Sequence, residues 1–203
     1  MYYKEGMAIL AILLTFAAFV PYIRLLLRNE IKPHYFSWMI WGFVTLTVCI
    51  AQLQDDGGVG AWPIGISGLI TMVVVVLSLR HRKTITITRM DWAFLIIATS
   101  SLPVWMLTSD PLWAVIILTA VEVLGFGPSI RKAYYHPYEE NVTFFVLFFI
   151  RNIVAVFALE HYSVTTMLFP LVASAACCFL IVTIVWRRTI VPKQQASSSS
   201  PSR

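Results

Sequence analysis

Long apolar runs separated by short polar connections divide most of the chain into seven segments. Each run is close to the roughly 20 residues that an α-helix needs to cross the hydrocarbon core of a bilayer. None of them alternates polar and apolar residues as a membrane-spanning β-strand would. The pattern predicts an all-α membrane protein with seven transmembrane helices, at residues 7–27, 35–53, 61–79, 91–108, 112–130, 141–159 and 164–186.

The composition is that of a chain that lies mostly in lipid. Hydrophobic residues make up 59% of the 203 residues and charged residues only 12%, which is more apolar side chain than a soluble domain of this size can bury. The formal charge of +5 comes from short basic runs between apolar segments, so we expect no nucleic-acid partner. The cysteines and histidines lack metal-ligand spacing, so we expect neither a metal site nor a cofactor.

The basic residues predict the orientation in the membrane. If the N-terminus is outside, the outer connections carry acidic residues, namely Asp55, Asp56, Asp110 and Glu160. Lysines and arginines collect on the cytoplasmic side of membrane proteins. The pattern therefore predicts an outer N-terminus, a cytoplasmic C-terminus and, as the location, the cell (inner) membrane. The cytoplasmic side then holds 13 of the 15 basic residues: Arg24, Arg28, Lys32, Arg80, Arg82, Lys83, Arg89, Arg131, Lys132, Arg187, Arg188, Lys193 and Arg203.

The two ends of the chain differ in character. The first apolar run lacks a preceding basic stretch and continues through Leu27 without a good cleavage site, so we expect a retained helix rather than a secretory signal. Residues 191–203 are rich in serine and glutamine, and we expect them to form a disordered cytoplasmic tail.

A short sequence from the first segment returns 107 residues later. Residues 19–24 read Phe-Val-Pro-Tyr-Ile-Arg, and residues 126–131 read Phe-Gly-Pro-Ser-Ile-Arg. Matches at one offset along a long stretch indicate a duplicated unit, here of three helices. The same offset relates three further places, Trp62-Pro63 to Phe169-Pro170, Ser67 to Ser174 and Arg80 to Arg187.

A unit of three helices enters the membrane on one side and leaves on the other, so a single helix between the copies keeps them parallel. We therefore predict two parallel three-helix bundles joined by a linker helix, in a 3+1+3 arrangement. The third helix of each unit is rich in small residues, which allow neighbouring helices to approach closely. The predicted divisions are a first repeat at 1–83, a linker at 84–110, a second repeat at 111–190 and the tail at 191–203.

This layout, with Pro21 and Pro128 near the inner ends of the first and fifth segments and a basic connection after each, resembles the SWEET and PQ-loop transporter superfamily. The resemblance covers about residues 7–188 in architecture. It implies a protein that carries a small polar solute, such as a sugar, an amino acid or a vitamin precursor. KDEL receptors are similar in fold, which implies the alternative of a receptor that binds a ligand in the same central cavity without transporting it.

Glu122 and Arg151 are charged residues inside predicted helices. Counted from the inner ends of their segments, they differ in depth by only about 3 Å. A charge at such a depth costs about 2.5 kcal/mol or more unless it is protonated, paired or hydrated. We interpret Glu122, Arg151 and the adjacent Asn152 as a substrate-binding or proton-coupling site, and a structural ion pair between two helices is the alternative. Thr15 and Thr47 take the corresponding places in the first half.

Other residues have a functional interpretation and a structural one. Trp41 lies one turn from Trp38 and is placed to stack on a ring of the solute, or to pack in the core. Ser67 and Ser174 are placed to bind the solute, or only the carbonyl of the preceding helical turn. We expect the other tryptophans to lie at the membrane interfaces, namely Trp38, Trp62, Trp92, Trp105, Trp113 and Trp186.

Two pairs of prolines occur at matching positions of the halves. Pro21 and Pro128 each remove a backbone hydrogen bond, and we predict that they are hinges, with static kinks as the alternative. Pro63 and Pro170 are expected to begin helices. No catalytic constellation occurs, so we predict a transporter that works by alternating access, facilitative (a uniporter) or proton-linked, and not an enzyme. Its partners would be the solute, the lipid bilayer and possible further copies of the chain.

Overall fold

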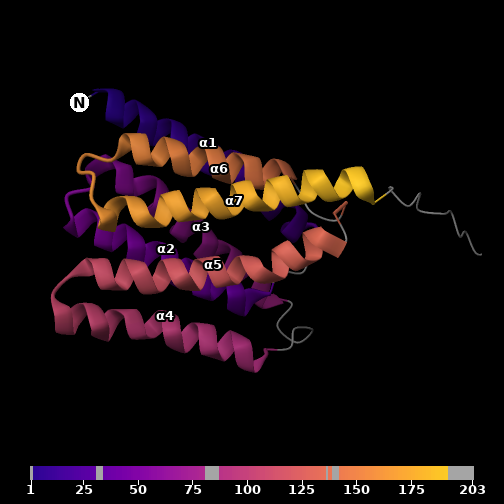
Figure 1. Ribbon diagram of the computed structural model, residues 1–203, viewed down its shortest axis with the longest axis horizontal. Coiled ribbons are helices and arrows are strands. Elements are labelled where there is room, and N and C mark those ends of the chain that lie inside the picture. The colour runs from indigo at the N-terminus through magenta and orange to yellow at the C-terminus, as the bar shows by residue number, and fades with distance from the viewer. Residues whose placement is uncertain (1, 31–33, 81–86, 136, 139–141, 192–203) are drawn as a thin grey trace, which may run out of the picture.

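The computed structural model describes residues 2–30, 34–80, 87–135, 137–138 and 142–191, and within these ranges it contains helices and no strand. The prediction of an all-α protein is confirmed. The helices lie side by side in a single elongated bundle (Figure 1). They are α1 (Tyr2–Leu27), α2 (Tyr35–Gln54), the short 3₁₀-helix η1 (Gly58–Ala61), α3 (Trp62–Ser78), α4 (Arg89–Thr108), α5 (Pro111–Tyr135), α6 (Val142–Ala158) and α7 (Val164–Ile190).

Five helical stretches are long and apolar enough to cross a membrane, at Tyr2–Leu27, Tyr35–Gln54, Gly58–Ser78, Arg89–Thr108 and Val164–Ile190. The remaining apolar helices, Pro111–Gly127 and Val142–Ala158, are shorter. Large apolar side chains on the outside of the bundle, such as Val76, Ile96 and Val182, are 60–66% exposed. Such a surface is stable in hydrocarbon and unfavourable in water. The helices therefore indicate an integral membrane protein.

Several helices extend beyond the predicted apolar runs. The helix α1 begins at Tyr2 rather than at residue 7, and α5 continues to Tyr135 rather than ending at residue 130. A helix satisfies its own backbone hydrogen bonds, so it continues past the hydrocarbon wherever no residue stops it. The start of α4, in contrast, is fixed by its sequence. Thr88 and Asp91 form a capping box around the first turn of this helix.

One end of the bundle holds the start of α1 and the α2–α3, α4–α5 and α6–α7 connections, and we call it the N-end (Figure 1). We call the opposite end the far end. The helix α3 packs against both α1 and α2, and α7 packs against both α5 and α6. The two groups meet through α1 against α6 and α2 against α5. The helix α4 packs on α5 and α2, and its own buried residues are only Ala98 and Ser101.

The predicted close packing of the third helix is confirmed for α3. A Cβ atom added to Gly65 would lie 2.7 Å from Cys49 Sγ, and one added to Gly68 would lie 2.8 Å from Leu46 Cδ2. Real Cβ atoms do not approach other heavy atoms so closely, so the absence of a side chain at both positions lets α3 pack closely against α2.

The two prolines expected to begin helices differ. Pro63 lies in the first turn of α3, as predicted. Pro170 lies inside α7, so that part of the prediction is wrong. The reason is local, because Ser163 and Thr166 form a capping box that starts the helix six residues before Pro170.

Gly68→Ala should lower the melting temperature of the detergent-solubilised protein relative to wild type. The added methyl group would overlap Leu46 and Thr45 Oγ1, and overpacking of this kind costs about 1–3 kcal/mol. Gly6→Ala is the matched control, since nothing lies within 4 Å of its Cβ position and alanine is the better helix former. Equal melting temperatures for the two variants would show that α3 does not need glycine at this contact.

Candidate functional site

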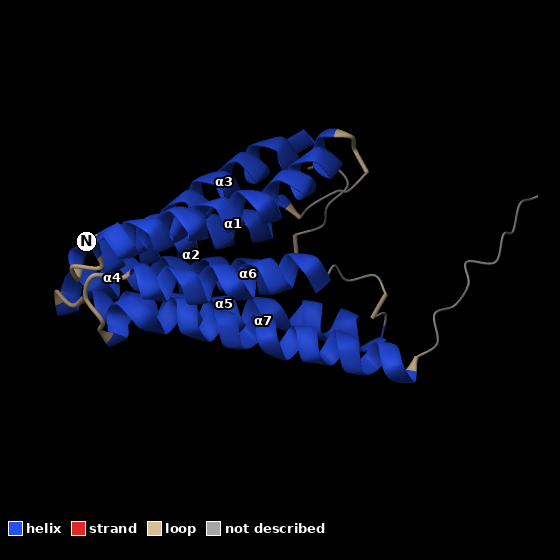
Figure 2. Ribbon diagram, turned by 90° about the horizontal axis from the view of Figure 1, so that it is seen from above, coloured by secondary structure: helices blue, strands red, loops and turns tan. Residues whose placement is uncertain are grey.

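A cavity of about 450 Å³ lies between α1, α2, α3, α5, α6 and α7. Its volume is in the range of small-molecule binding sites, which are mostly apolar with a few placed polar groups. Its lining in α1 starts at Ala17, in α2 it ends at Thr45, and in α6 it ends at Asn152. The cavity therefore lies in the half of the bundle toward the far end. Figure 2 shows the α1 and α3 ribbons diverging there from α5 and α7.

Arg151 of α6 is only 2% exposed, yet it faces this cavity. Its Nη1 donates to Asn152 Oδ1 at 2.8 Å and its Nη2 donates to Ser67 Oγ at 3.0 Å. The guanidinium carbon lies 4.9 Å from the centre of the Phe148 ring, a cation–π contact. Its Nε is buried and has no hydrogen-bond partner among the described residues. Because Ser67 belongs to α3, this contact joins the two groups of helices.

Glu122 of α5 lines the same cavity. Its Oε2 is buried and, among the residues that the structure describes, has no hydrogen-bond partner. The carboxylate and the Arg151 guanidinium interact electrostatically, but they form no ion pair within the 4.0 Å limit in the described part of the chain. The site thus holds two opposite charges that face one cavity without direct contact.

Aromatic rings form much of the wall. The Phe144 and Phe148 rings stack with their centres 4.6 Å apart, and those of Tyr22 and Trp38 lie 4.9 Å apart. Trp41 lies next to Trp38 at 5.5 Å and also lines the cavity. A Cβ atom at Gly125 would lie 3.1 Å from Trp41 Nε1, so the glycine leaves room for the indole.

Some cavity residues were not identified from the sequence. Trp38, expected at the interface, is buried at 8% exposure and lines the cavity, so that prediction is wrong. The signal was its spacing, because Trp38, Trp41 and Thr45 fall on one face of α2. In α6, Phe144, Phe148 and Arg151 likewise fall on one face of the helix. This spacing would have identified the two phenylalanines as site residues.

The predicted site residues separate into two sets. Glu122, Arg151, Asn152, Trp41 and Ser67 line the cavity, as does Pro21 in the continuous helix α1. The remainder are buried away from it, where the Thr15 hydroxyl donates to Ala11 O at 2.9 Å and the Ser174 hydroxyl donates to Pro170 O at 2.8 Å. Thr47 is also buried outside the lining. Position 128 is helical, but the Pro128 side chain lies outside the described part.

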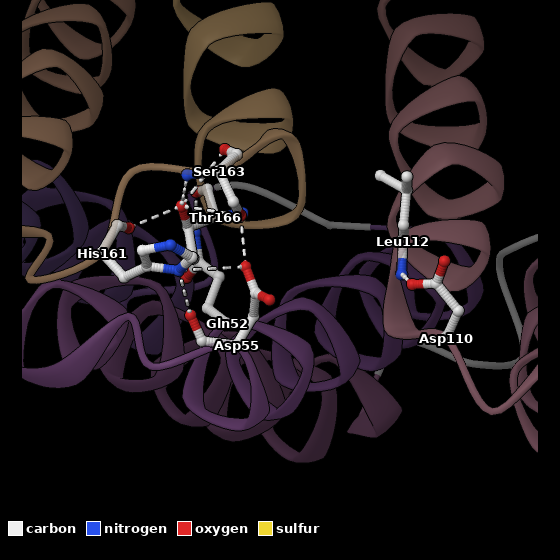
Figure 3. A network of polar contacts seen from close by, with 7 residues as sticks. All are labelled: Gln52, Asp55, Asp110, Leu112, His161, Ser163 and Thr166. Atoms are coloured by element: carbon white, nitrogen blue, oxygen red, sulfur yellow. Dashed lines mark hydrogen bonds and ion pairs between the residues drawn. The ribbon is translucent and has the colours of Figure 1, made fainter.

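The N-end is closed by contacts between the α2–α3 and α6–α7 connections, which we call the N-end seal (Figure 3). The Asp55 carboxylate accepts a hydrogen bond from Ser163 Oγ. His161 Nδ1 lies 3.1 Å from the Asp55 backbone oxygen and 3.7 Å from Asp55 Oδ2. Gln52 Nε2 donates to the backbone oxygen of Thr166 at 2.6 Å.

The backbones also meet at the N-end seal. The Glu160 N–H donates to Gly57 O at 3.1 Å, and Lys4 Nζ of α1 donates to Leu159 O at 2.6 Å. A Cβ atom at Gly60 would lie 2.5 Å from the Cα of Leu159, and Gly58 has a positive φ of 58°. Both positions therefore favour glycine, one for close approach and one for its backbone conformation. The cavity is shut off from the N-end.

The chain matches no protein-family model, no curated protein and no solved structure. The function is therefore inferred from the geometry of the site.

Asp55→Asn should lower the melting temperature and increase hydrogen exchange at the N-end. The change removes the negative charge that Ser163 and His161 contact, and a hydrogen bond to a charged group contributes about 1.5–3 kcal/mol. The matched control is Asp56→Asn, because Asp56 is exposed and asparagine tolerates its positive φ of 57°. If both variants behaved alike, Asp55 would not hold the N-end seal.

Proposed function

We propose that the protein is a multi-pass membrane transporter that moves a small polar solute by alternating access, either as a uniporter or linked to protons. One observation carries the proposal. Glu122 and Arg151, each with a buried polar atom, face a solute-sized cavity in one half of the bundle, while the other half is closed by the N-end seal. A binding site that is closed at one end of the bundle is what alternating access requires of each state.

The arrangement that supports this mechanism is 3+1+3, with α1–α3 and α5–α7 as parallel repeats and α4 as the linker. The packing supports it, because exchanging α1, α2 and α3 for α5, α6 and α7 maps the main contacts within and between the two groups onto one another. In each group the third helix packs against the other two, and the exchange turns the α1–α6 contact into the α5–α2 contact. This is the layout of the SWEET and PQ-loop superfamily, to which we assign the chain as part of the proposal.

The N-end faces the outside of the cell (inner) membrane, and the far end and the C-terminal tail face the cytoplasm. The distribution of charge supports this orientation. Asp55, Asp110 and Glu160 lie at the N-end, whereas Arg24 and Arg187 lie in the last turns of helices that end at the far end. The described conformation is then closed to the outside, with its cavity on the cytoplasmic side.

The opposite state requires the two connections of the N-end seal to separate. Two of the N-end contacts, from Lys4 to Leu159 O and from His161 to Asp55 O, are single hydrogen bonds to backbone oxygens at part-buried or exposed positions, and such a bond is worth about 1 kcal/mol because water can replace it. The seal can therefore open without a large barrier from any one contact. Pro21 lies in α1 at the cavity wall, where a missing backbone hydrogen bond allows the helix to bend.

The orientation is tested with single cysteines on either side of α4, in a background whose three native cysteines are changed to alanine. We expect Asp110→Cys, but not Arg89→Cys, to react with a membrane-impermeant maleimide on intact cells. Both side chains are exposed, so only sidedness should separate them. Labelling of Arg89→Cys alone on intact cells would reverse the orientation, and labelling of both only after the cells are broken open would contradict the location in the cell membrane.

Alternating access is tested by locking the N-end seal. In the same background, Val59→Cys and Glu160→Cys place two thiols where the Val59 N–H now donates to Glu160 Oε1 at 3.3 Å. We expect oxidation to abolish uptake into proteoliposomes, and a reductant to restore it, because the outward-facing state can no longer form. The assay uses radiolabelled D-glucose and L-phenylalanine, and the two single-cysteine variants are the controls.

Uptake that is unchanged by the cross-link would contradict the alternating-access mechanism. Saturable binding of a solute by the wild-type protein without any flux would favour the receptor alternative. Binding and flux are both measured on the same purified protein. Binding without flux is therefore distinguished from flux that the cross-link does not change.

A further inference from the structure

The chemical class of the solute follows from the charges of the cavity. Among the lining residues that the structure describes, only Glu122 and Arg151 are charged, and each keeps a buried atom without a described partner. We propose that the cavity binds a small zwitterion, with a carboxylate at Arg151, an ammonium at Glu122, and an aromatic or large aliphatic body, as in an apolar α-amino acid. The proposal rests on the proposed function for transport, but binding itself can be tested without it.

The Arg151 guanidinium has N–H donors without a described partner, and these can bind a carboxylate. Arginine has five N–H donors, and the contacts of Nη1 and Nη2 with Asn152 and Ser67 use two of them. The Nε–H has no described partner, so donors remain for a carboxylate, which guanidinium binds in a fork geometry. Asn152 and Ser67 fix the orientation of the group, and the Phe148 ring supports it from one face.

The Glu122 carboxylate is the complementary end. Its unpaired Oε2 is an acceptor, and an ammonium group supplies three donors that can turn toward it. The hydroxyls of Thr45 and Thr71, on the cavity wall, already donate to backbone oxygens of their own helices at 2.8 Å. Their protons are thus engaged within the protein.

The charge balance decides between solute classes. A neutral sugar would leave both charges uncompensated, and an anion or a cation alone would leave one of them without a partner. An unpaired charge in an apolar, low-dielectric cavity is costly, whereas a zwitterion compensates both at once. Because Glu122 and Arg151 do not pair directly, the solute does not have to break an ion pair to enter.

The aromatic rings of the cavity wall favour a solute with an apolar side chain. The stacked pair Phe144–Phe148 and the pair Tyr22–Trp38 present ring surfaces to the cavity. Burying an aromatic or branched side chain against such rings is favourable in proportion to the area removed from water. A volume of about 450 Å³ is large enough for an amino acid of this kind.

The first test needs no variant. Isothermal titration calorimetry on the wild-type protein in lipid nanodiscs compares L-phenylalanine and L-leucine with phenethylamine, 3-phenylpropionate and D-glucose. We expect an amino acid to bind about 10- to 100-fold more tightly than either single-charge analogue, since each loses one charged hydrogen-bonded contact. Equal affinity for a single-charge analogue, tighter binding of glucose, or no binding by either amino acid would overturn the proposal.

The second test assigns each charge to its partner. Glu122→Gln should weaken binding of L-phenylalanine about 10- to 100-fold and leave it no better than 3-phenylpropionate. Arg151→Gln should weaken it similarly and leave it no better than phenethylamine. Such reciprocal changes in selectivity are not expected from structural damage, which would reduce binding of all compounds together. A uniform loss in variants whose melting temperatures are unchanged would refute the assignment.

The matched controls are Glu30→Gln and Arg28→Gln. These residues form an ion pair of 3.8 Å outside the cavity with side chains 51% and 73% exposed, and their loss should leave binding unchanged. Failure of this inference and of the proposed function are separable. Glucose flux without amino-acid binding would refute the zwitterion but keep a transporter, whereas amino-acid binding without flux would keep the zwitterion but favour a receptor.

Discussion

The structure depends on the need to satisfy a guanidinium group inside an apolar bundle. Arg151 is nearly fully buried, and in such surroundings an unsatisfied charge is far more costly than in water. Its hydrogen bond to Ser67 comes from a helix 84 positions away in sequence, so this contact holds α6 and α3 together at the cavity. In the part of the chain that the structure describes, the other polar contacts between the two groups gather at the N-end. The bundle is thus fixed at one end and at the site, and it diverges toward the far end (Figure 2).

Much of this could be predicted from the sequence, and the missing parts have physical causes. Hydropathy predicted the all-helical class and the long apolar helices, because lipid requires long apolar runs. It misplaced several ends, because a helix continues beyond the hydrocarbon until a cap or a break stops it. The charged pair was identified because charges are rare inside such helices. The Arg151–Ser67 contact could not be predicted, since hydropathy does not specify which faces of distant helices meet.

The aromatic wall was missed for a different reason. Position relative to a segment end was used to assign Trp38 to the membrane interface, but the rotational face of the helix decides where the side chain lies. The spacing of Trp38, Trp41 and Thr45 contained that information. A residue can therefore be assigned to the lipid or to the interior only when both its depth in the membrane and the helix face on which it lies are considered.

The helices α1–α3 and α5–α7 contribute different chemistry to the cavity, which bears on how a solute would lie. Ser67 accepts from Arg151, whereas its counterpart Ser174 bonds only to its own helix. Both charged groups come from α5 and α6, while α1 and α2 contribute rings and no charge to the lining. A solute with its charges at one end would therefore lie with that end toward α5 and α6 and its apolar body toward α1 and α2.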